Sequence, residues 1–241
     1  RMAGRVPTDN PSYHAGGWFA ALPGDAQAAC WHSAITAMVA LHRLDPCADG
    51  FEFLVDAPWG MPPDADPGLM RLAQWRDFLR WGARRPLPPI ERALDELARC
   101  CPPPSPPRVH WGDAKISNCV IDGNRVQALL DWELCGLSDP QEDLAFFLLL
   151  DWAQWRSLGL ARLPHLPSPR ATVDHYAALA GRPQPQVLWW FRFGLVRLAI
   201  IYHRFIERRI DAGRLTPDVD AVALNPMCDL LPEILNLEAL P

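Results

Sequence analysis

The sequence predicts a mainly helical α+β fold with one small β-hairpin near the middle of the chain. Over most of the length, apolar residues recur at the spacing of a buried helix face. Between residues 119 and 130 the pattern changes to two short β-prone runs around a turn. Stretches rich in proline and glycine separate these segments and mark loops.

Composition places the chain among folded globular proteins. Its 241 residues are 49% hydrophobic and carry a net charge of only −5, which excludes disorder as the main state. A pI of about 5.8, without any block of basic residues, argues against a nucleic-acid binder. We therefore expect a folded protein whose partner is not a nucleic acid.

Besides the helix that follows the hairpin, six segments have the apolar spacing of helices. They cover residues 25–44, 67–82, 89–100, 170–180, 184–209 and 218–235. Asp25 can cap the first of these helices, and a run of prolines between residues 102 and 107 ends the third. Residues 1–24 and 45–64 are rich in Gly and Pro and are expected to be irregular.

Residues 119–121 and 126–130 are expected to form the hairpin. The Asp122-Gly123 pair between them is typical of a hairpin turn. A further buried helix is expected to begin directly after Asp139, which suits the N-cap position.

The most apolar stretch, residues 187–206, is expected to cross the protein core and not a membrane. It contains Arg192, Arg197 and Arg204, and a central arginine costs about 2.5–3.5 kcal/mol in a membrane helix. Seven cysteines without a CxxC pair favour reduced thiols over disulfides or a zinc site. The first residues do not have the pattern of a secretory signal, so we expect a cytoplasmic protein.

The segment 113–131 carries the residue types that phosphoryl transfer requires. A carboxylate must orient the acceptor hydroxyl and accept its proton, and hard oxygen ligands must hold Mg²⁺ beside the triphosphate. A cation must offset the charge that develops on the transferred group. Asp113 can be the carboxylate and Lys115 the cation. Asn118 and Asp131 can hold the metal, because the hairpin brings these two positions side by side.

The pattern D-x-K-x-x-N, hairpin, D-W-E resembles the catalytic loop and metal-binding Asp of the protein-kinase-like superfamily. The whole chain is similar to the aminoglycoside phosphotransferase family, and residues 109–145 are the most specific part of this resemblance. Residues 4–7 and 41–45 resemble the branch related to acyl-CoA dehydrogenase-associated phosphotransferases.

The resemblance implies an ATP-dependent phosphotransferase that uses Mg²⁺ and acts on a hydroxyl of a small molecule. It assigns catalysis to Asp113 and Lys115, and contact with ATP to Lys115, Asn118 and Asp131. Asn118 and Asp131 are the expected metal ligands. The sequence leaves the identity of the hydroxylated substrate open, and no nucleic acid or membrane partner is expected.

Two departures from the family pattern change these expectations. Trp111 occupies the position of the histidine in the family's H-G-D loop, and we expect it to pack, because that histidine is chiefly architectural. The sequence has no glycine-rich phosphate loop, and Lys115 is its only lysine. Residues 1–241 are therefore expected to be a carboxy-terminal lobe without the amino-terminal one, with residues 1–24 as a hinge-like lead-in. Such a lobe should bind ATP weakly and expose apolar surface that favours association.

Two other functions fit the same residues. One is a non-catalytic binding module that lost nucleotide binding, and the other is a metal-dependent phosphohydrolase that uses Asp113 and Asp131 without ATP. Asp143 is either an acid near a helix start or, as the resemblance suggests, a brace for the catalytic loop. Glu133 faces either solvent or the substrate and metal, and His42 is expected to be structural.

Overall fold

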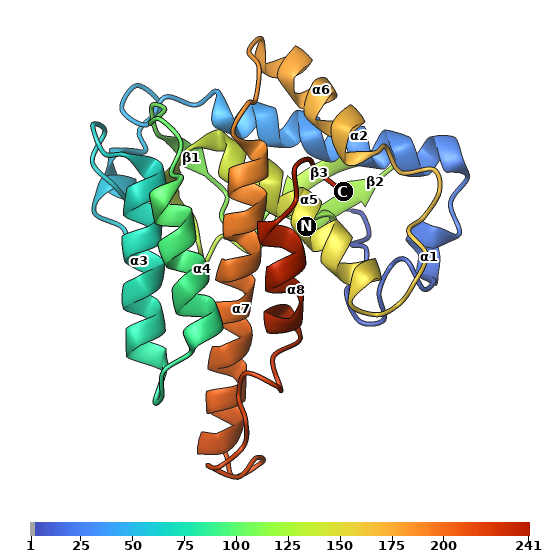
Figure 1. Ribbon diagram of the computed structural model, residues 1–241. Coiled ribbons are helices and arrows are strands. Elements are labelled where there is room, and N and C mark those ends of the chain that lie inside the picture. The colour runs from blue at the N-terminus through green and yellow to red at the C-terminus, as the bar shows by residue number, and fades with distance from the viewer. Residues whose placement is uncertain (1–2) are drawn as a thin grey trace.

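Helices dominate the computed structural model, which describes residues 3–241 (Figure 1). The longer helices are α2 (Gly24–His42), α3 (Pro67–Gly82), α4 (Pro88–Arg99), α5 (Pro140–Arg156), α6 (Pro169–Ala180), α7 (Val187–Asp211) and α8 (Pro226–Leu235). The short helical pieces are α1 (Gly17–Ala20), η1 (Glu52–Val55) and η2 (Ile116–Asn118). The strands are β1 (Arg108–His110), β2 (Cys119–Asp122), β3 (Arg125–Leu129) and β4 (Gly136–Ser138). The mainly helical α+β prediction is confirmed.

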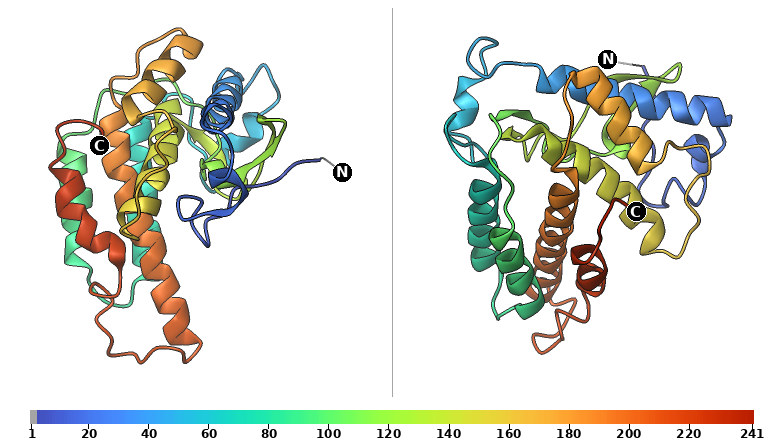
Figure 2. Two further views of the ribbon diagram at one scale, coloured as in Figure 1. Left: turned by 90° about the vertical axis from the view of Figure 1, so that its right-hand side faces the viewer. Right: turned by 45° about the horizontal axis from the view of Figure 1, so that its top comes forward.

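The helices form a bundle with a layer across one end. α3, α4, α7 and α8 run side by side, and α2 and α6 lie across the end of this bundle (Figure 1). α5 packs along α7 (Figure 2), while the β2–β3 hairpin lies beside α2. Because α5 lies between the hairpin and the bundle, its first turn is the natural place for groups that connect the two.

Most helix ends lie within three residues of the sequence prediction; α7, for example, spans Val187–Asp211 where residues 184–209 are expected. Two N-terminal ends depart from the prediction in other ways. α2 begins one residue before Asp25, with Pro23 at the N-cap, so Asp25 lies in the first turn and does not cap the helix. α8 begins at Pro226 and not at residue 218. The side chain of Asp220 accepts backbone hydrogen bonds that form a turn, and the Asn225 side chain then caps α8.

Two small antiparallel sheets flank the loop of residues 111–118. β2 and β3 form the expected hairpin, with Cys119 opposite Leu129. Its turn contains Gly123 and Asn124, both with positive φ, as the Asp-Gly signal indicates. The second sheet, which pairs His110 of β1 with Gly136 of β4, is not predicted by the sequence because strands of three residues are too short to show a periodicity.

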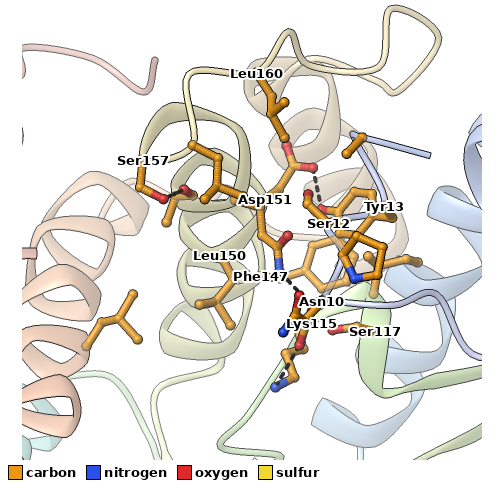
Figure 3. Close-up of a pocket in the computed structure, with 18 of the residues that line it drawn as sticks. Asn10, Ser12, Tyr13, Lys115, Ser117, Phe147, Leu150, Asp151, Ser157 and Leu160 are labelled. Atoms are coloured by element: carbon orange, nitrogen blue, oxygen red, sulfur yellow. Dashed lines mark hydrogen bonds and ion pairs between the residues drawn. The ribbon is translucent and has the colours of Figure 1, made fainter. Parts of the chain in front are cut away.

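The lead-in, described from residue 3 to residue 24, is held in place on two sides, although the sequence suggests an irregular segment. Arg5 exchanges backbone hydrogen bonds with Ile121 of β2, with N···O distances of 2.9 and 2.8 Å. Further along, the hydroxyl of Tyr13 donates to Asp151 of α5 at 2.7 Å (Figure 3). The segment therefore joins the hairpin to α5.

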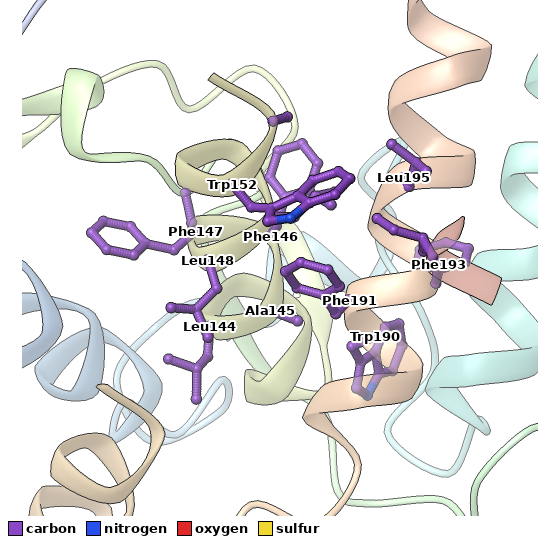
Figure 4. Packing of buried hydrophobic residues seen from close by; sticks show 14 of the residues in the cluster. Leu144, Ala145, Phe146, Phe147, Leu148, Trp152, Trp190, Phe191, Phe193 and Leu195 are labelled. Atoms are coloured by element: carbon purple, nitrogen blue, oxygen red, sulfur yellow. The ribbon is translucent and has the colours of Figure 1, made fainter. Parts of the chain in front are cut away.

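Aromatic side chains from α5 and α7 fill the centre of the core (Figure 4). Phe146 and Phe147 on α5 and Phe191 and Phe193 on α7 are at most 1% exposed. α7 crosses the core as predicted, with Arg197 buried among these rings. Across residues 3–241, no helix combines the length and apolarity that a membrane crossing needs.

Replacing Phe191 by Ala is expected to lower the free energy of unfolding by about 3–5 kcal/mol, because a fully buried ring leaves a cavity. Phe205→Ala on the same helix is the matched control, since that ring is 55% exposed, and we expect a change within about 0.5 kcal/mol. Urea denaturation followed by circular dichroism measures both. Equal losses in the two variants would contradict this description of the core.

Candidate active site

The loop after β1 turns sharply at Gly112, which places Asp113 at the surface end of the core. Gly112 has φ +93°, and a Cβ there would come within 2.2 Å of the carbonyl oxygen of Leu134. Only glycine fits both the backbone conformation and the close approach. Asp113 follows with its side chain 18% exposed, which leaves its carboxylate accessible.

The structure brings three of the four predicted site residues into contact. Lys115 Nζ lies 3.0 Å from Asp113 Oδ2, and Asn118 Nδ2 donates to the same oxygen at 2.8 Å. The turn η2 returns Asn118 to Asp113, whose carbonyl oxygen also accepts from Nδ2 at 3.0 Å. Burial tends to lower the pKa of Lys115, but the carboxylates of Asp113 and Asp9 outweigh it and raise that pKa. Lys115 is therefore a charged ammonium group beside the candidate base.

The fourth residue, Asp131, is positioned by the hairpin. The backbone N–H of Leu130 donates to the carbonyl oxygen of Asn118 at 2.8 Å, so Asp131 is the next residue past this pairing. Asp131 adopts the left-handed region with φ 61° and is exposed. Within residues 3–241 its carboxylate forms no ion pair and no hydrogen bond, which leaves it available for a ligand.

Asp143 braces the candidate catalytic loop. Of the two roles that the sequence left open for Asp143, this is the one that the resemblance suggests. Its Oδ2 accepts from the backbone N–H of Trp111 at 2.7 Å, and its Oδ1 accepts from that of Gly112 at 2.9 Å. Burial alone would raise the pKa of Asp143, but His110, His42 and the amide of Gly112 hold that pKa well below its usual range. A buried carboxylate thus fixes the two residues that precede Asp113.

The two histidines beside Asp143 are structural. His42 Nε2 lies 3.0 Å from Asp143 Oδ2, and its Nδ1 lies 2.6 Å from the hydroxyl of Tyr176. His110 Nε2 lies 3.1 Å from Asp143 Oδ1, and burial lowers the pKa of His110 despite the nearby carboxylates. Trp111 is fully buried and donates to the carbonyl oxygen of Leu130, which confirms that it packs.

Comparison with known proteins identifies the family. The model of the phosphotransferase enzyme family (APH) matches residues 11–188, which is most of the chain and includes Asp113 through Asp143. The chain belongs to the phosphotransferase enzyme family. The more specific branch related to acyl-CoA dehydrogenase-associated phosphotransferases is not identified by this match and stays a prediction.

Solved structures show that this family member has a protein-kinase-like fold. A candidate aminoglycoside phosphotransferase from Ralstonia eutropha superposes with a TM-score of 0.72 at 22% identity, covering 97% of this chain and 70% of that one. An ethanolamine kinase from Plasmodium vivax has a TM-score of 0.60 at 10% identity, covering 98% and 63%. A thermostable aminoglycoside phosphotransferase APH(4)-Ia, in complex with AMP-PNP and hygromycin B, has a TM-score of 0.55 at 16% identity, covering 97% and 70%.

Beneath the catalytic loop of this phosphotransferase-family chain lies a buried ionic layer. Arg71 Nε donates to Glu142 Oε2 at 3.0 Å, and Arg197 Nη1 lies 3.5 Å from Glu142 Oε1. Arg197 also donates to the carbonyl oxygen of Gly112 and stacks on the ring of Phe146 at 3.9 Å. The sequence places Arg197 on a helix that crosses the core, where it is either paired or reaches out to solvent, but does not predict its contact with Gly112. The role of Arg71 is not predicted at all.

The donor set around Asn118 and Asp131 fits a Mg²⁺ ion. Because Asn118 uses its amide nitrogen to bind Asp113, its amide oxygen is free to face a metal. The carboxylate of Asp131 adds a second hard oxygen ligand, and Mg²⁺ commonly takes only one or two protein ligands and fills the rest with phosphate oxygens and water. No other protein group is needed to complete such a site.

Replacing Asp143 by Asn is expected to lower the free energy of unfolding by about 3–5 kcal/mol near neutral pH, since it breaks a buried charged network. The pKa of Asp143 is lowered by folding, so its stabilisation is present above the unfolded pKa of about 3.9 and is lost as pH falls further. The difference between wild type and variant should therefore shrink between about pH 6 and about pH 3.

Urea denaturation at the two pH values measures this difference. Asp174→Asn is the matched control, because the side chain of Asp174 is 58% exposed and pairs only with Arg170 of the same helix. We expect this control to change stability by less than about 0.5 kcal/mol at either pH. A difference for Asp143→Asn that stays constant with pH would show that its charge does not stabilise the loop.

Proposed function

We propose that this chain carries the catalytic residues of an ATP-dependent phosphotransferase that acts on a hydroxyl of a small molecule. The contact of Asp113 with both Lys115 and Asn118, next to the free carboxylate of Asp131, carries the proposal. The match to the phosphotransferase family favours neither a non-catalytic module nor a phosphohydrolase.

Each residue has a separate task in the proposed reaction. Asp113 accepts a hydrogen bond from the acceptor hydroxyl and takes its proton as the oxygen attacks the γ-phosphorus, while the bond from that phosphorus to the β,γ-bridging oxygen breaks and ADP leaves. Lys115, held charged by Asp113 and Asp9, lies where it offsets the negative charge of the transferred group. Asn118 and Asp131 would hold Mg²⁺, which neutralises the charge of the phosphate oxygens.

ATP as donor is supported by the nucleotide complex of a relative with the same fold. That relative holds AMP-PNP together with the hydroxylated compound hygromycin B. All seven cysteines of this chain are free thiols, which fits the reducing cytoplasm that we propose as its location.

We also propose that residues 1–241 form one lobe of the protein-kinase-like fold, with residues 1–24 as its lead-in. The chain covers between 63% and 70% of the three compared structures. The β-bridge between Arg5 and Ile121 supports the lead-in, because it fixes this segment to the hairpin that lies between the proposed metal ligands Asn118 and Asp131. Partly exposed Leu130 and Trp132 beside the hairpin are the surface through which association is proposed.

Replacing Asp113 by Asn is expected to reduce turnover by about 10²–10⁴-fold with the fold intact, because the amide cannot accept the proton. Release of ADP and the mass of the phosphorylated acceptor measure the reaction. The full-length protein is used, with Asp122→Asn in the exposed hairpin turn as control. Unchanged turnover in Asp113→Asn would remove this residue from the role of base.

Replacing Asp131 by Asn is expected to weaken metal binding in the presence of nucleotide by at least about tenfold, since a carboxylate ligand is lost. Electron paramagnetic resonance of Mn²⁺, used as a probe for Mg²⁺, measures the bound fraction without requiring turnover. The control is again Asp122→Asn, which should bind Mn²⁺ as the wild type does. Equal Mn²⁺ affinities for all three proteins would place the metal elsewhere.

A further inference from the structure

We infer that the acceptor binds in the cavity beside Lys115 and that this acceptor is an uncharged alcohol with an apolar body. The inference rests on the proposed function, because it names the substrate class for the same site. It differs from what an aminoglycoside site would require, since aminoglycosides carry several ammonium groups and bind best to free carboxylates.

The cavity leads away from the catalytic residues. It has a volume of about 670 Å³ and lies between the lead-in and α5, with Lys115 on its wall (Figure 3). Figure 3 shows Lys115 and Leu160 at opposite ends of the group of lining residues. Because Lys115 Nζ contacts Asp113, a molecule that fills the cavity can place one end beside the candidate base.

Most of the wall is apolar. The hydrocarbon and ring contributions come from Pro11, Ala15, Phe147, Leu150, Ala153, Leu158, Leu160, Leu198, Tyr202 and Met227. These residues come from the lead-in, from α5 and its following loop, and from α7 and α8. Such a wall favours a ligand that buries hydrocarbon, at roughly 25 cal/mol for each Å² of apolar surface removed from water.

The charged groups of the wall are already paired with one another. Asp9 lies 3.4 Å from Lys115 Nζ and accepts from Gln154 at 2.8 Å. Asp151 accepts from Arg162 Nε at 2.7 Å and from the hydroxyl of Tyr13 at 2.7 Å. An ammonium group inside the cavity would lose its water, and the two carboxylates of the wall, Asp9 and Asp151, already bind other groups, which is unfavourable.

Two polar atoms in the wall lack a partner. Ser117 Oγ and Gln154 Oε1 are buried and form no hydrogen bond within the described residues. Ser117 is 9% exposed and directly precedes Asn118, so its hydroxyl marks the catalytic end of the cavity. Buried polar groups in native proteins are almost always satisfied. Ser117 Oγ has almost no exposed surface, so we infer that the Ser117 side chain turns toward the cavity when a hydroxyl of the acceptor binds it.

The test compares two probes of the same length with the complete protein in the absence of ATP. Octanediol has a hydroxyl at each end, and in aminooctanol one hydroxyl is replaced by an ammonium group. Calorimetry or saturation-transfer NMR is expected to show octanediol binding at least about tenfold more tightly. Equal or tighter binding of aminooctanol would overturn the inference.

Variants locate the binding. Leu150→Glu places an unpaired carboxylate in the wall. We expect it to weaken the binding of octanediol and to strengthen the binding of aminooctanol, each by at least about fivefold. Leu69→Glu on α3 is the matched control, because Leu69 is 51% exposed and lies outside the cavity. If Leu150→Glu fails to fold, the smaller change Ser117→Ala is used instead, and we expect it to weaken the binding of octanediol by about fivefold. Binding that none of these cavity variants changes would overturn the inference.

These binding measurements need no ATP, so a negative result for the inferred substrate class can be distinguished from a negative result for the proposed function. Selective binding of octanediol, together with no phosphorylation of any hydroxylated acceptor by the full-length protein with ATP, would contradict phosphoryl transfer and leave the cavity's selectivity standing. Turnover of an aminoglycoside, with octanediol neither bound nor competing, would support phosphoryl transfer and overturn the inferred substrate class.

Discussion

The buried carboxylate of Asp143 is the interaction on which the active site depends. It accepts the backbone N–H groups of Trp111 and Gly112 and contacts His42 of α2. Trp111 and Gly112 belong to one loop and His42 lies far before it in the sequence, so one side chain joins this loop, α2 and the first turn of α5. The positive end of the α5 dipole also favours a negative charge in this turn. Without the Asp143 carboxylate, the two buried backbone N–H groups would lack acceptors, which costs about 1–3 kcal/mol of stability for each group.

The ionic layer below the loop extends this constraint to the helical bundle. Glu142, the neighbour of Asp143, binds Arg71 of α3 and Arg197 of α7, and Arg197 binds the carbonyl oxygen of Gly112. Both the N–H and the C=O of Gly112 are therefore fixed by side chains of the core. A loop held at both polar groups keeps Asp113 in one geometry, and such positioning is what phosphoryl transfer demands of a protein.

The sequence predicts the helices and the hairpin well, but it predicts the contacts between them poorly. Helical spacing locates α3 and α4 to within a residue, and the Asp-Gly turn locates the hairpin that brings Leu130 against Asn118. The β1–β4 pairing and the contact between Arg71 and Glu142 depend on residues about 30 to 70 positions apart, which periodicity cannot relate. The orphan hydroxyl of Ser117 likewise has no local signature. Long-range packing decides such contacts, so only the structure places them.

Three aspartates within this small region have different surroundings, which suit them to different roles in the proposed reaction. Asp143 is fully buried, and the N–H groups and histidines around it use its oxygens, so it has none left for a ligand. Asp113 is partly accessible. Its carboxylate pairs with Lys115 and accepts a hydrogen bond from Asn118, and these two side chains orient it without burying it completely. Asp131 is exposed and unpaired in the described chain, so its oxygens remain open. The three carboxylates thus range from saturated to free, and burial together with the number of bound partners sets this order. The order matches the bracing, proton transfer and metal binding that we propose for them.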